Sequence, residues 1–140
     1  MFVKSAPLPT ITNGEMKLGF GPNYISTWES KIQFSPLLIT FTADADLENY
    51  LSIWYWIMLK ADPNSFGQAL EASQLKTTAS LIILNNSNQK VREFIFYDLH
   101  PMDLNELDLN YQSNEQNEVS CTFAFTNFLP TDYFNIVSAL

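Results

Sequence analysis

The chain has 140 residues, which is the length of a single domain (1–140) with room for a real hydrophobic core. Its net charge is −8, and the whole excess falls in residues 93–140, which hold eight acidic side chains and no Lys or Arg. Phosphate binding depends on Lys and Arg, so this third of the chain is not a nucleic-acid-binding surface. A single cysteine excludes a disulfide framework, and no apolar run reaches the length of a membrane span.

The first predicted elements are the two strands of a long hairpin. Residues 5–14 contain two prolines and a glycine, which is typical of an extended lead-in segment. Residues 15–34 then alternate like strands on both sides of Gly21-Pro22. A two-stranded ribbon is marginal by itself, and this one carries several aromatic residues. We therefore expect it to contact another subunit through Phe20, Tyr24 and Trp28.

A buried strand and one helix follow. Residues 35–42 are rich in β-formers and almost uniformly apolar, which predicts a strand inside a sheet. Residues 44–59 change to a helical period. Asp44 or Asp46 is expected to cap the helix, with Glu48 in its first turn favourable to the helix dipole.

The predicted helix is apolar on more than one face. The helical spacing places five apolar residues on one face, which are Leu47, Tyr50, Leu51, Trp54 and Met58. We expect Leu51 and Trp54 to be the main side chains that anchor the helix in the core. Residues 54–58 are apolar in succession, so they cover further faces. Such a helix is either deeply buried or meets a second protein, and both interpretations are kept.

The next segment predicts a loop, a second hairpin and no catalytic centre. Residues 60–77 form a loop with one short helical turn at 67–73, and residues 80–97 form a hairpin around the polar turn 85–89. His100, the one histidine, stands before a proline in an expected connector, without a nucleophile elbow elsewhere. Asp103, Glu106 and Asp108 lack the spacing of a calcium loop. We expect no catalytic, metal or cofactor site.

Residues 106–125 alternate around a polar turn at 113–117, which predicts a third hairpin. Its apolar positions are Leu107, Leu109, Tyr111, Val119, Cys121, Phe123 and Phe125. The polar positions and the turn carry four carboxylates, which are Glu106, Asp108, Glu115 and Glu118. An ordinary solvated face is the simplest interpretation of these acids.

Three stretches together resemble the inner tail tube protein family of contractile-tailed bacteriophages. They are "KSAPLPTI", "FSPLLITFTADADLENYLSIWYWI" and residues 82–128, which begin "IILNNSNQ" and end "SCTFAFTNF". The third stretch has the family pattern of a hairpin, a connector with proline, an acidic strand, an Asn/Glu-rich turn and a long last strand. Its matching positions are Leu99, Pro101, Leu107, Leu109, Glu115, Phe123 and Phe125. The resemblance covers about residues 4–128 and has structural rather than catalytic motifs.

The resemblance implies a mainly β fold, a β-sandwich or small barrel of antiparallel strands with one packed helix. It implies a non-enzymatic subunit that forms homo-hexameric rings stacked into a tube, in a virion tail assembled in the host cytoplasm. Tail sheath and baseplate proteins are the implied partners, viral DNA passes without specific binding, and no membrane is involved. The carboxylates of Glu106, Asp108, Glu115 and Glu118 would then line the lumen and repel DNA.

Two departures from the family pattern keep alternatives open. Family members usually have a further N-terminal strand before the "APLP" segment, and residues 130–140 run past the usual end. Both features also suit a baseplate or tube-end adaptor, such as an initiator or terminator. From a different class, a small-ligand-binding β-barrel would use the aromatic side chains to line a pocket.

Overall fold

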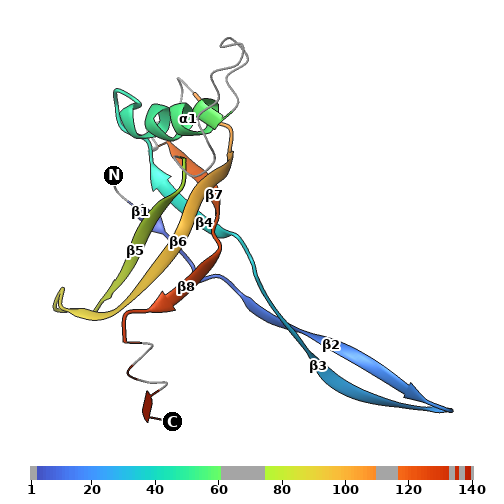
Figure 1. Cartoon of the computed structure of the whole chain (residues 1–140). Helices are drawn as coiled ribbons and strands as arrows, with labels where there is room; N and C mark the ends of the chain where they lie inside the picture. The colour runs from blue at the N-terminus through green and yellow to red at the C-terminus, as the bar shows by residue number, and fades with distance from the viewer. Residues whose placement is uncertain (1–2, 61–74, 110–116, 133–134, 136–137, 140) are drawn as a thin grey trace.

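The computed structural model describes residues 3–60, 75–109, 117–132, 135 and 138–139, with the backbone alone for residues 15–16, 20, 24–30 and 60 (Figure 1). The helical turn expected at 67–73 and the turn at 113–117, apart from Asn117, lie outside these residues. The elements in chain order are β1 (Val3–Ser5), β2 (Ile11–Phe20), β3 (Asn23–Phe34), β4 (Leu37–Thr42), α1 (Glu48–Lys60), β5 (Thr77–Leu84), β6 (Lys90–Leu104), β7 (Glu118–Ala124) and β8 (Asn127–Pro130).

The main sheet has the order β1-β4-β7-β6-β5, and β8 pairs with β6 beside this path. All of these pairs are antiparallel. Strand β6 turns a corner, because residues 90–99 pair with β5 and β8 while residues 100–104 pair with β7. At the corner Asp98 has a φ of 56°, and its carboxylate accepts a hydrogen bond of 2.9 Å from the Thr126 hydroxyl.

The prediction of a mainly antiparallel β protein with one packed helix is therefore confirmed. The barrel is not: the described strands form an open path that ends at β1 on one side and β5 on the other. The aromatic side chains that could have lined a ligand pocket pack on one another instead. Phe96 stacks on Phe128 with ring centroids 5.2 Å apart and meets Phe125 edge-on at 5.1 Å. No helix in the described part of the chain is long and apolar enough to cross a membrane.

The core lies where alternate residues of β4 and β7 face helix α1. Phe41 and Cys121 are fully buried; Leu37 shares the parity of Phe41 on β4, and Val119 and Phe123 share that of Cys121 on β7. Burying such side chains is the main stabilising contribution to the fold, at about 1.5–3 kcal/mol each. The buried cluster consists of Leu37, Phe41, Ile53, Phe96, Leu99, Val119, Cys121, Phe123 and Phe128.

Helix α1 is confirmed, but the predicted anchors are wrong. Ile53 is 7% exposed and enters the core, whereas Leu51 and Trp54 are 39% and 40% exposed. Tyr50, Trp56 and Ile57 pack against the core beside Ile53. The helix is apolar around much of its circumference, so spacing alone did not distinguish the buried face from its neighbour.

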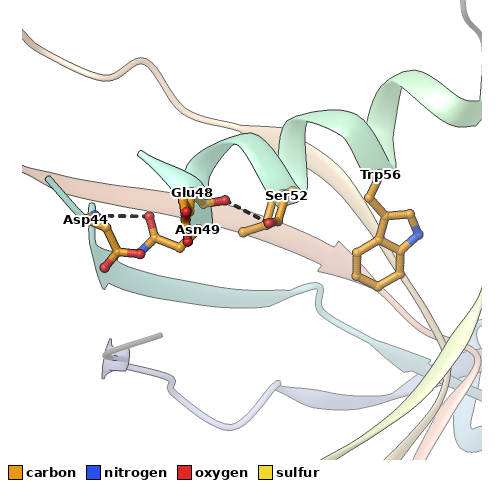
Figure 2. A pocket seen from close by; sticks show the side chains of 6 residues that line it. Asp44, Glu48, Asn49, Ser52 and Trp56 are labelled. Atoms are coloured by element: carbon orange, nitrogen blue, oxygen red, sulfur yellow. Dashed lines mark hydrogen bonds between the residues drawn. The ribbon is translucent and has the colours of Figure 1, made fainter. Parts of the chain in front are cut away.

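The start of helix α1 is held by the side chain of Asn49 and not by the aspartate cap that was predicted. The Asn49 side chain donates to the Thr42 carbonyl at 2.7 Å and accepts from the Asp44 amide at 3.1 Å. Leu47 has a φ of 57°, a left-handed conformation that leucine rarely adopts. The buried Asn49 amide group therefore ties the end of β4 to the first turn of α1 across this strained link (Figure 2).

Two of the three predicted hairpins are confirmed and the third is wrong. Strands β2–β3 and β5–β6 pair as expected, and the β5–β6 turn is closed by Asn85, whose side chain accepts from the amides of Ser87 and Gln89 at 2.9 Å. Residues 105–109 form no strand. Strand β6 instead continues through the expected connector as far as Leu104, so His100 lies within a strand and β7 pairs with β4 and this end of β6.

A short strand, β1, does precede the "APLP" segment, and it pairs with Thr40 and Phe41 of β4. Its register is irregular, and all three of its residues are exposed. The edge of β4 is therefore covered, although by a strand of only three residues.

Candidate assembly surfaces

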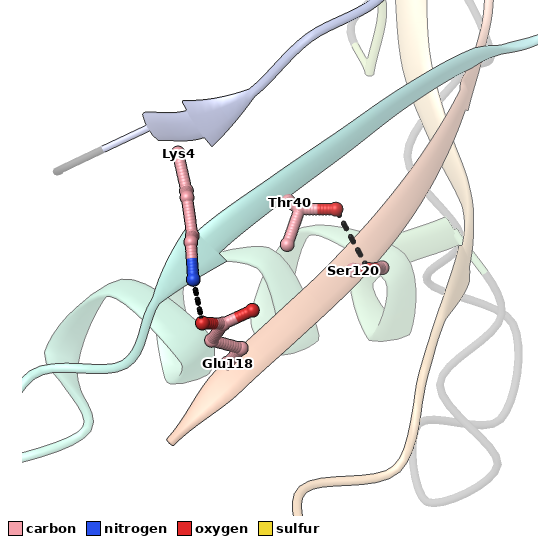
Figure 3. Close-up of polar contacts among 4 residues, drawn as sticks. All are labelled: Lys4, Thr40, Glu118 and Ser120. Atoms are coloured by element: carbon pink, nitrogen blue, oxygen red, sulfur yellow. Dashed lines mark hydrogen bonds and ion pairs between the residues drawn. The ribbon is translucent and has the colours of Figure 1, made fainter. Parts of the chain in front are cut away.

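We refer to the face of the sheet opposite α1 as the polar face, because Lys4, Thr40, Glu118 and Ser120 lie on it (Figure 3). Alternation along β4 and β7 places Thr40 opposite Ser120, and their hydroxyls are hydrogen-bonded at 2.9 Å. At the end of the same face Lys4 of β1 forms an ion pair with Glu118 of β7, across the intervening strand β4. Both partners of this pair are about half exposed, so it contributes at most about 1 kcal/mol.

The structure places three of the four predicted lumen carboxylates, and it places them apart. Glu118 lies on the polar face and forms an ion pair with Lys4. Lys4 lies outside residues 93–140, which contain no Lys or Arg of their own. Glu106 and Asp108 are exposed, but they follow the end of β6 and belong to no strand. Glu115 lies outside the described residues.

The expected strand alternation fails just after Glu106. Leu107 packs against the core, yet Leu109 is 70% exposed. The reason is that β7 already has a strand on each side: Leu104 of β6 lies opposite Cys121, and Ile39 of β4 lies opposite the same residue. The Asn105 amide makes one more bond, of 2.9 Å, to the Ser120 carbonyl, and the ladder ends there.

Strand β5 is a long, apolar edge of the main sheet. It has eight residues, pairs with β6 on one side and has no described strand on the other. Ile82, Ile83 and Leu84 are 48%, 39% and 53% exposed. Sheets usually protect such an edge with a charged side chain or a proline. Residues 77–84 contain neither.

Strands β2 and β3 form a separate two-stranded ribbon that projects away from the rest of the chain (Figure 1). Gly21 has a φ of 61°, the left-handed conformation that the tight turn with Pro22 requires. At the base the Thr10 amide donates to the Ser35 hydroxyl at 2.7 Å, and the Ser35 amide donates back to the Thr10 carbonyl. The described side chains of the ribbon include exposed Ile11, Leu18 and Ile32.

The predicted contact residues Phe20, Tyr24 and Trp28 all belong to this ribbon. Phe20 lies opposite Asn23 beside the turn, Tyr24 opposite Gly19, and Trp28 opposite Glu15. Their contact with another subunit stays a prediction.

Helix α1 carries exposed apolar side chains and an open groove along one flank (Figure 2). Leu51, Tyr55 and Leu59 are 39%, 58% and 50% exposed along its outer face. The groove has a volume of about 450 Å³ and is lined by Asp44, Glu48, Asn49, Ser52, Ile53 and Trp56. We refer to these six residues as the α1 groove. Sequence reasoning did not find it, because its lining comes from two segments joined only by the turn at Leu47.

Titratable side chains of the described residues do not assemble a reactive centre. Burial raises the pKa of the Cys121 thiol to about 12, with a smaller contribution from Asp103, so the thiol stays protonated at neutral pH. The His100 ring nitrogen Nδ1 lies 3.0 Å from the Asp98 carbonyl. No group of three or more potential metal ligands occurs in the part of the chain that the structure describes.

Comparison with known proteins gives the fold a context. No protein-family model and no curated protein sequence matches the chain. The tube-terminating cap of the anti-feeding prophage is 13% identical, with a TM-score of 0.69 over 94% of this chain and 80% of the other. A chain of the sheath–tube complex of an extracellular contractile injection system, PVC, is 11% identical, with a TM-score of 0.65 over 94% and 81%.

A chain of the anti-feeding prophage baseplate is likewise 11% identical, with a TM-score of 0.60 over 91% of this chain and 77% of the other. All three structures are parts of phage-like or extracellular contractile particles. Each of the three similarities covers more than nine tenths of this chain. The chain therefore has the fold of the tail-tube-type structural proteins found in the tubes, tube ends and baseplates of contractile injection systems.

Proposed function

We propose that this protein is a non-enzymatic structural subunit of the inner tube of a phage-type contractile tail. Six copies close into a ring, and rings stack into a tube whose channel conducts viral DNA without binding it specifically. The tail sheath and baseplate are its partners, and the subunit assembles in the host cytoplasm before it becomes part of the virion tail. One structural observation carries the proposal: a single chain presents both an unprotected sheet edge and a ribbon that leaves its own domain.

The unprotected edge supports ring closure. Strand β5 ends the sheet on one side, and the short strand β1 ends it on the other. Pairing the β5 edge of one copy with the opposite edge of the next is a heterologous contact, and such contacts form rings when the rotation closes. Ring closure would also remove an apolar edge that invites aggregation in the free subunit.

In the proposed ring the polar face of β4–β7 lines the lumen and helix α1 lies outside. This face carries hydroxyl side chains and an ion pair whose two charges cancel, so it would form a hydrophilic wall with little net positive charge. Glu118 lies on this face together with its partner Lys4. Glu106, Asp108 and Glu115 are expected to add net negative charge around it, so that DNA is repelled rather than held.

A tube-end cap, or a baseplate adaptor, is the second candidate. The similarity to a tube-terminating cap extends over most of both chains, and so does the similarity to the sheath–tube chain. The two similarities therefore support the tube end and the tube body about equally. A terminal subunit would form one ring and stop, whereas a tube subunit stacks without limit.

Native mass spectrometry and negative-stain electron microscopy of the purified protein test the proposal. We expect hexamers and tubes; isolated hexamers alone would favour the terminator, and a stable monomer at high concentration would contradict both. A variant with Ile82→Lys and Leu84→Lys should stay folded but lose the ring, since it places charge along the β5 edge. The control Leu51→Lys adds charge to the outer face of α1 and should leave the ring intact.

A further inference from the structure

Strand β1 covers one edge of the main sheet with few interactions, whereas strand β5 leaves the other edge open (Figure 1). β1 has three residues and pairs only with Thr40 and Phe41, although β4 has six residues. The register of this pairing is irregular, and all three residues of β1 are exposed. Very short edge strands are one of the ways in which sheets avoid pairing with another chain. The function of β1 in the free subunit is therefore protective.

The side chains of β1 add one polar contact and little buried surface. The Lys4 ammonium reaches across β4 to the Glu118 carboxylate of β7 (Figure 3). These two side chains are 58% and 44% exposed, so water weakens their attraction. The buried core cluster of the described residues contains no side chain from β1. Release of β1 from β4 would therefore sacrifice little apolar burial of its own.

The segment that joins β1 to the ribbon has the composition of a stiff hinge. Pro7 and Pro9 flank Leu8, which is 44% exposed. Proline fixes its own φ and biases the preceding residue toward an extended conformation, so a released segment stays extended. Pro9 is buried, and Thr10 belongs to the hydrogen-bonded clamp at the base of the ribbon. The chain is therefore held from Pro9 onward, and residues 3–8 can move together; we refer to them as the β1 arm.

We propose that the β1 arm is an autoinhibitory strand, which covers the β4 edge in the free subunit and is displaced from it by strand β5 of a second copy. The strand lengths support this exchange. Pairing the eight residues of β5 with the three of β1 would leave most backbone groups of β5 unpaired, whereas β4 offers six residues. The inference rests on the proposed ring and adds that ring closure requires the arm to leave. A free subunit then exposes only one of the two edges of the ring contact, so it associates slowly.

A reversible lock tests whether the arm must leave. Ser5 and Thr40 lie opposite each other on β1 and β4. Opposite Cα atoms of antiparallel strands are about 4.5–5.5 Å apart, a separation that a disulfide can span. The variant with Ser5→Cys and Thr40→Cys can therefore be cross-linked by oxidation, while Cys121 is fully buried. The oxidised variant should form at least about tenfold fewer rings than the same protein after reduction, because the lock removes the binding-competent state.

Charge reversal releases the arm instead of locking it. Lys4→Glu places two carboxylates together and should raise the association constant at least about threefold, because more subunits have an open β4 edge. Adding Glu118→Lys should return the constant to within about twofold of the wild type. Arg92→Glu is the matched control, since it breaks an ion pair of similar exposure to Asp132 and changes the net charge equally. It should stay within about twofold of the wild type, and melting curves verify the folding of each variant.

Each outcome decides one of the two proposals. Rings that form equally well with the arm oxidised and reduced, or a Lys4→Glu variant that associates no better than Arg92→Glu, would overturn the arm and leave the ring intact. If reduction does not restore the rings, the charge variants decide. If the wild type forms no rings, the proposed function fails, and sedimentation velocity still judges the arm. Lys4→Glu should then self-associate more than Arg92→Glu, because an open strand edge pairs with other chains. Equal amounts of monomer for both variants would overturn the arm as well.

Discussion

Ile53 is the side chain through which helix α1 enters the core, and the residues around it divide into a buried and an exposed set. Ile53 is 7% exposed and belongs to the same cluster as Phe41, Val119 and Phe123. Leu51 and Trp54, on the adjoining faces, are each about two fifths exposed, and Trp54 meets Tyr55 edge-on at 5.2 Å. The helix therefore presents large apolar side chains on both sides of its contact with the sheet.

At this scale we expect Ile53→Ala to lower the free energy of unfolding by about 2–5 kcal/mol, because it leaves a cavity beneath the helix. Leu51→Ala, an equally conservative truncation of an exposed side chain, should change it by no more than about 0.5 kcal/mol. Urea unfolding followed by circular dichroism measures both. Equal losses for the two variants would show that α1 does not sit on the sheet through the Ile53 face.

The β2–β3 ribbon is the element with the fewest contacts to the rest of the described chain. It forms a two-stranded sheet apart from the main one, and its connection to the domain is the Thr10–Ser35 clamp together with Phe34, which packs on Phe125 and Phe128. The ladder between its two strands is interrupted by a register shift between Asn13 and Glu15. Two-stranded ribbons are marginally stable in water without a third partner.

For this element we expect ribbon amides to exchange with solvent quickly in isolated subunits and slowly in assembled tubes, because a neighbouring copy covers them. Hydrogen exchange with mass spectrometry measures this for peptides covering residues 11–34. Amides of β4 and β7, which are central in the sheet, should be protected in both states and serve as the internal reference. Equal ribbon protection in monomers and tubes would remove the proposed contact through Phe20, Tyr24 and Trp28.

The fold shows which acidic side chains of the molecule have basic partners. The acidic last third is partly neutralised by Lys4, Lys90 and Arg92, which come from the first two thirds and pair with Glu118, Glu93 and Asp132. A hydrogen bond from Lys90 lowers the pKa of Glu93, so this carboxylate keeps its charge to a lower pH than a free glutamate. Glu106 and Asp108 are exposed and belong to none of these ion pairs of the described residues.

For the assembled particle we expect tubes of the variant with Glu106→Lys and Asp108→Lys to retain short duplex DNA at low salt, protected from nuclease inside the channel. Retention should fall steeply as salt rises, as phosphate contacts do. The variant with Glu106→Gln and Asp108→Asn, which removes charge without reversing it, should retain little. Nuclease-sensitive DNA, or none, on the lysine tubes would show that these carboxylates do not face the lumen.

The sequence by itself determined the elements whose pattern is local. Period-two alternation predicted the β2–β3 and β5–β6 hairpins and the buried parity of β7, and the helical period predicted α1, because side-chain direction follows directly from backbone geometry. The resemblance to tail tube proteins rested on the same local order, and the comparison of folds supports it at a coarse level. Turn residues such as Gly21 and Asn85 marked the reversals correctly, since their backbone or side-chain chemistry acts within a few residues.

Only the tertiary structure decided which neighbour each element has. The alternation of residues 106–111 predicted a strand paired with β7. Both edges of β7 are instead occupied by β4 and by the end of β6. Pairing between segments that are distant in sequence leaves no local signal. The same applies to Glu118, whose Lys4 partner lies 114 residues away, and to α1, where several apolar faces compete and the shape of the sheet selects Ile53. The open β5 edge and the α1 groove are likewise properties of packing, because an edge or a groove exists only once the neighbouring segments have been placed.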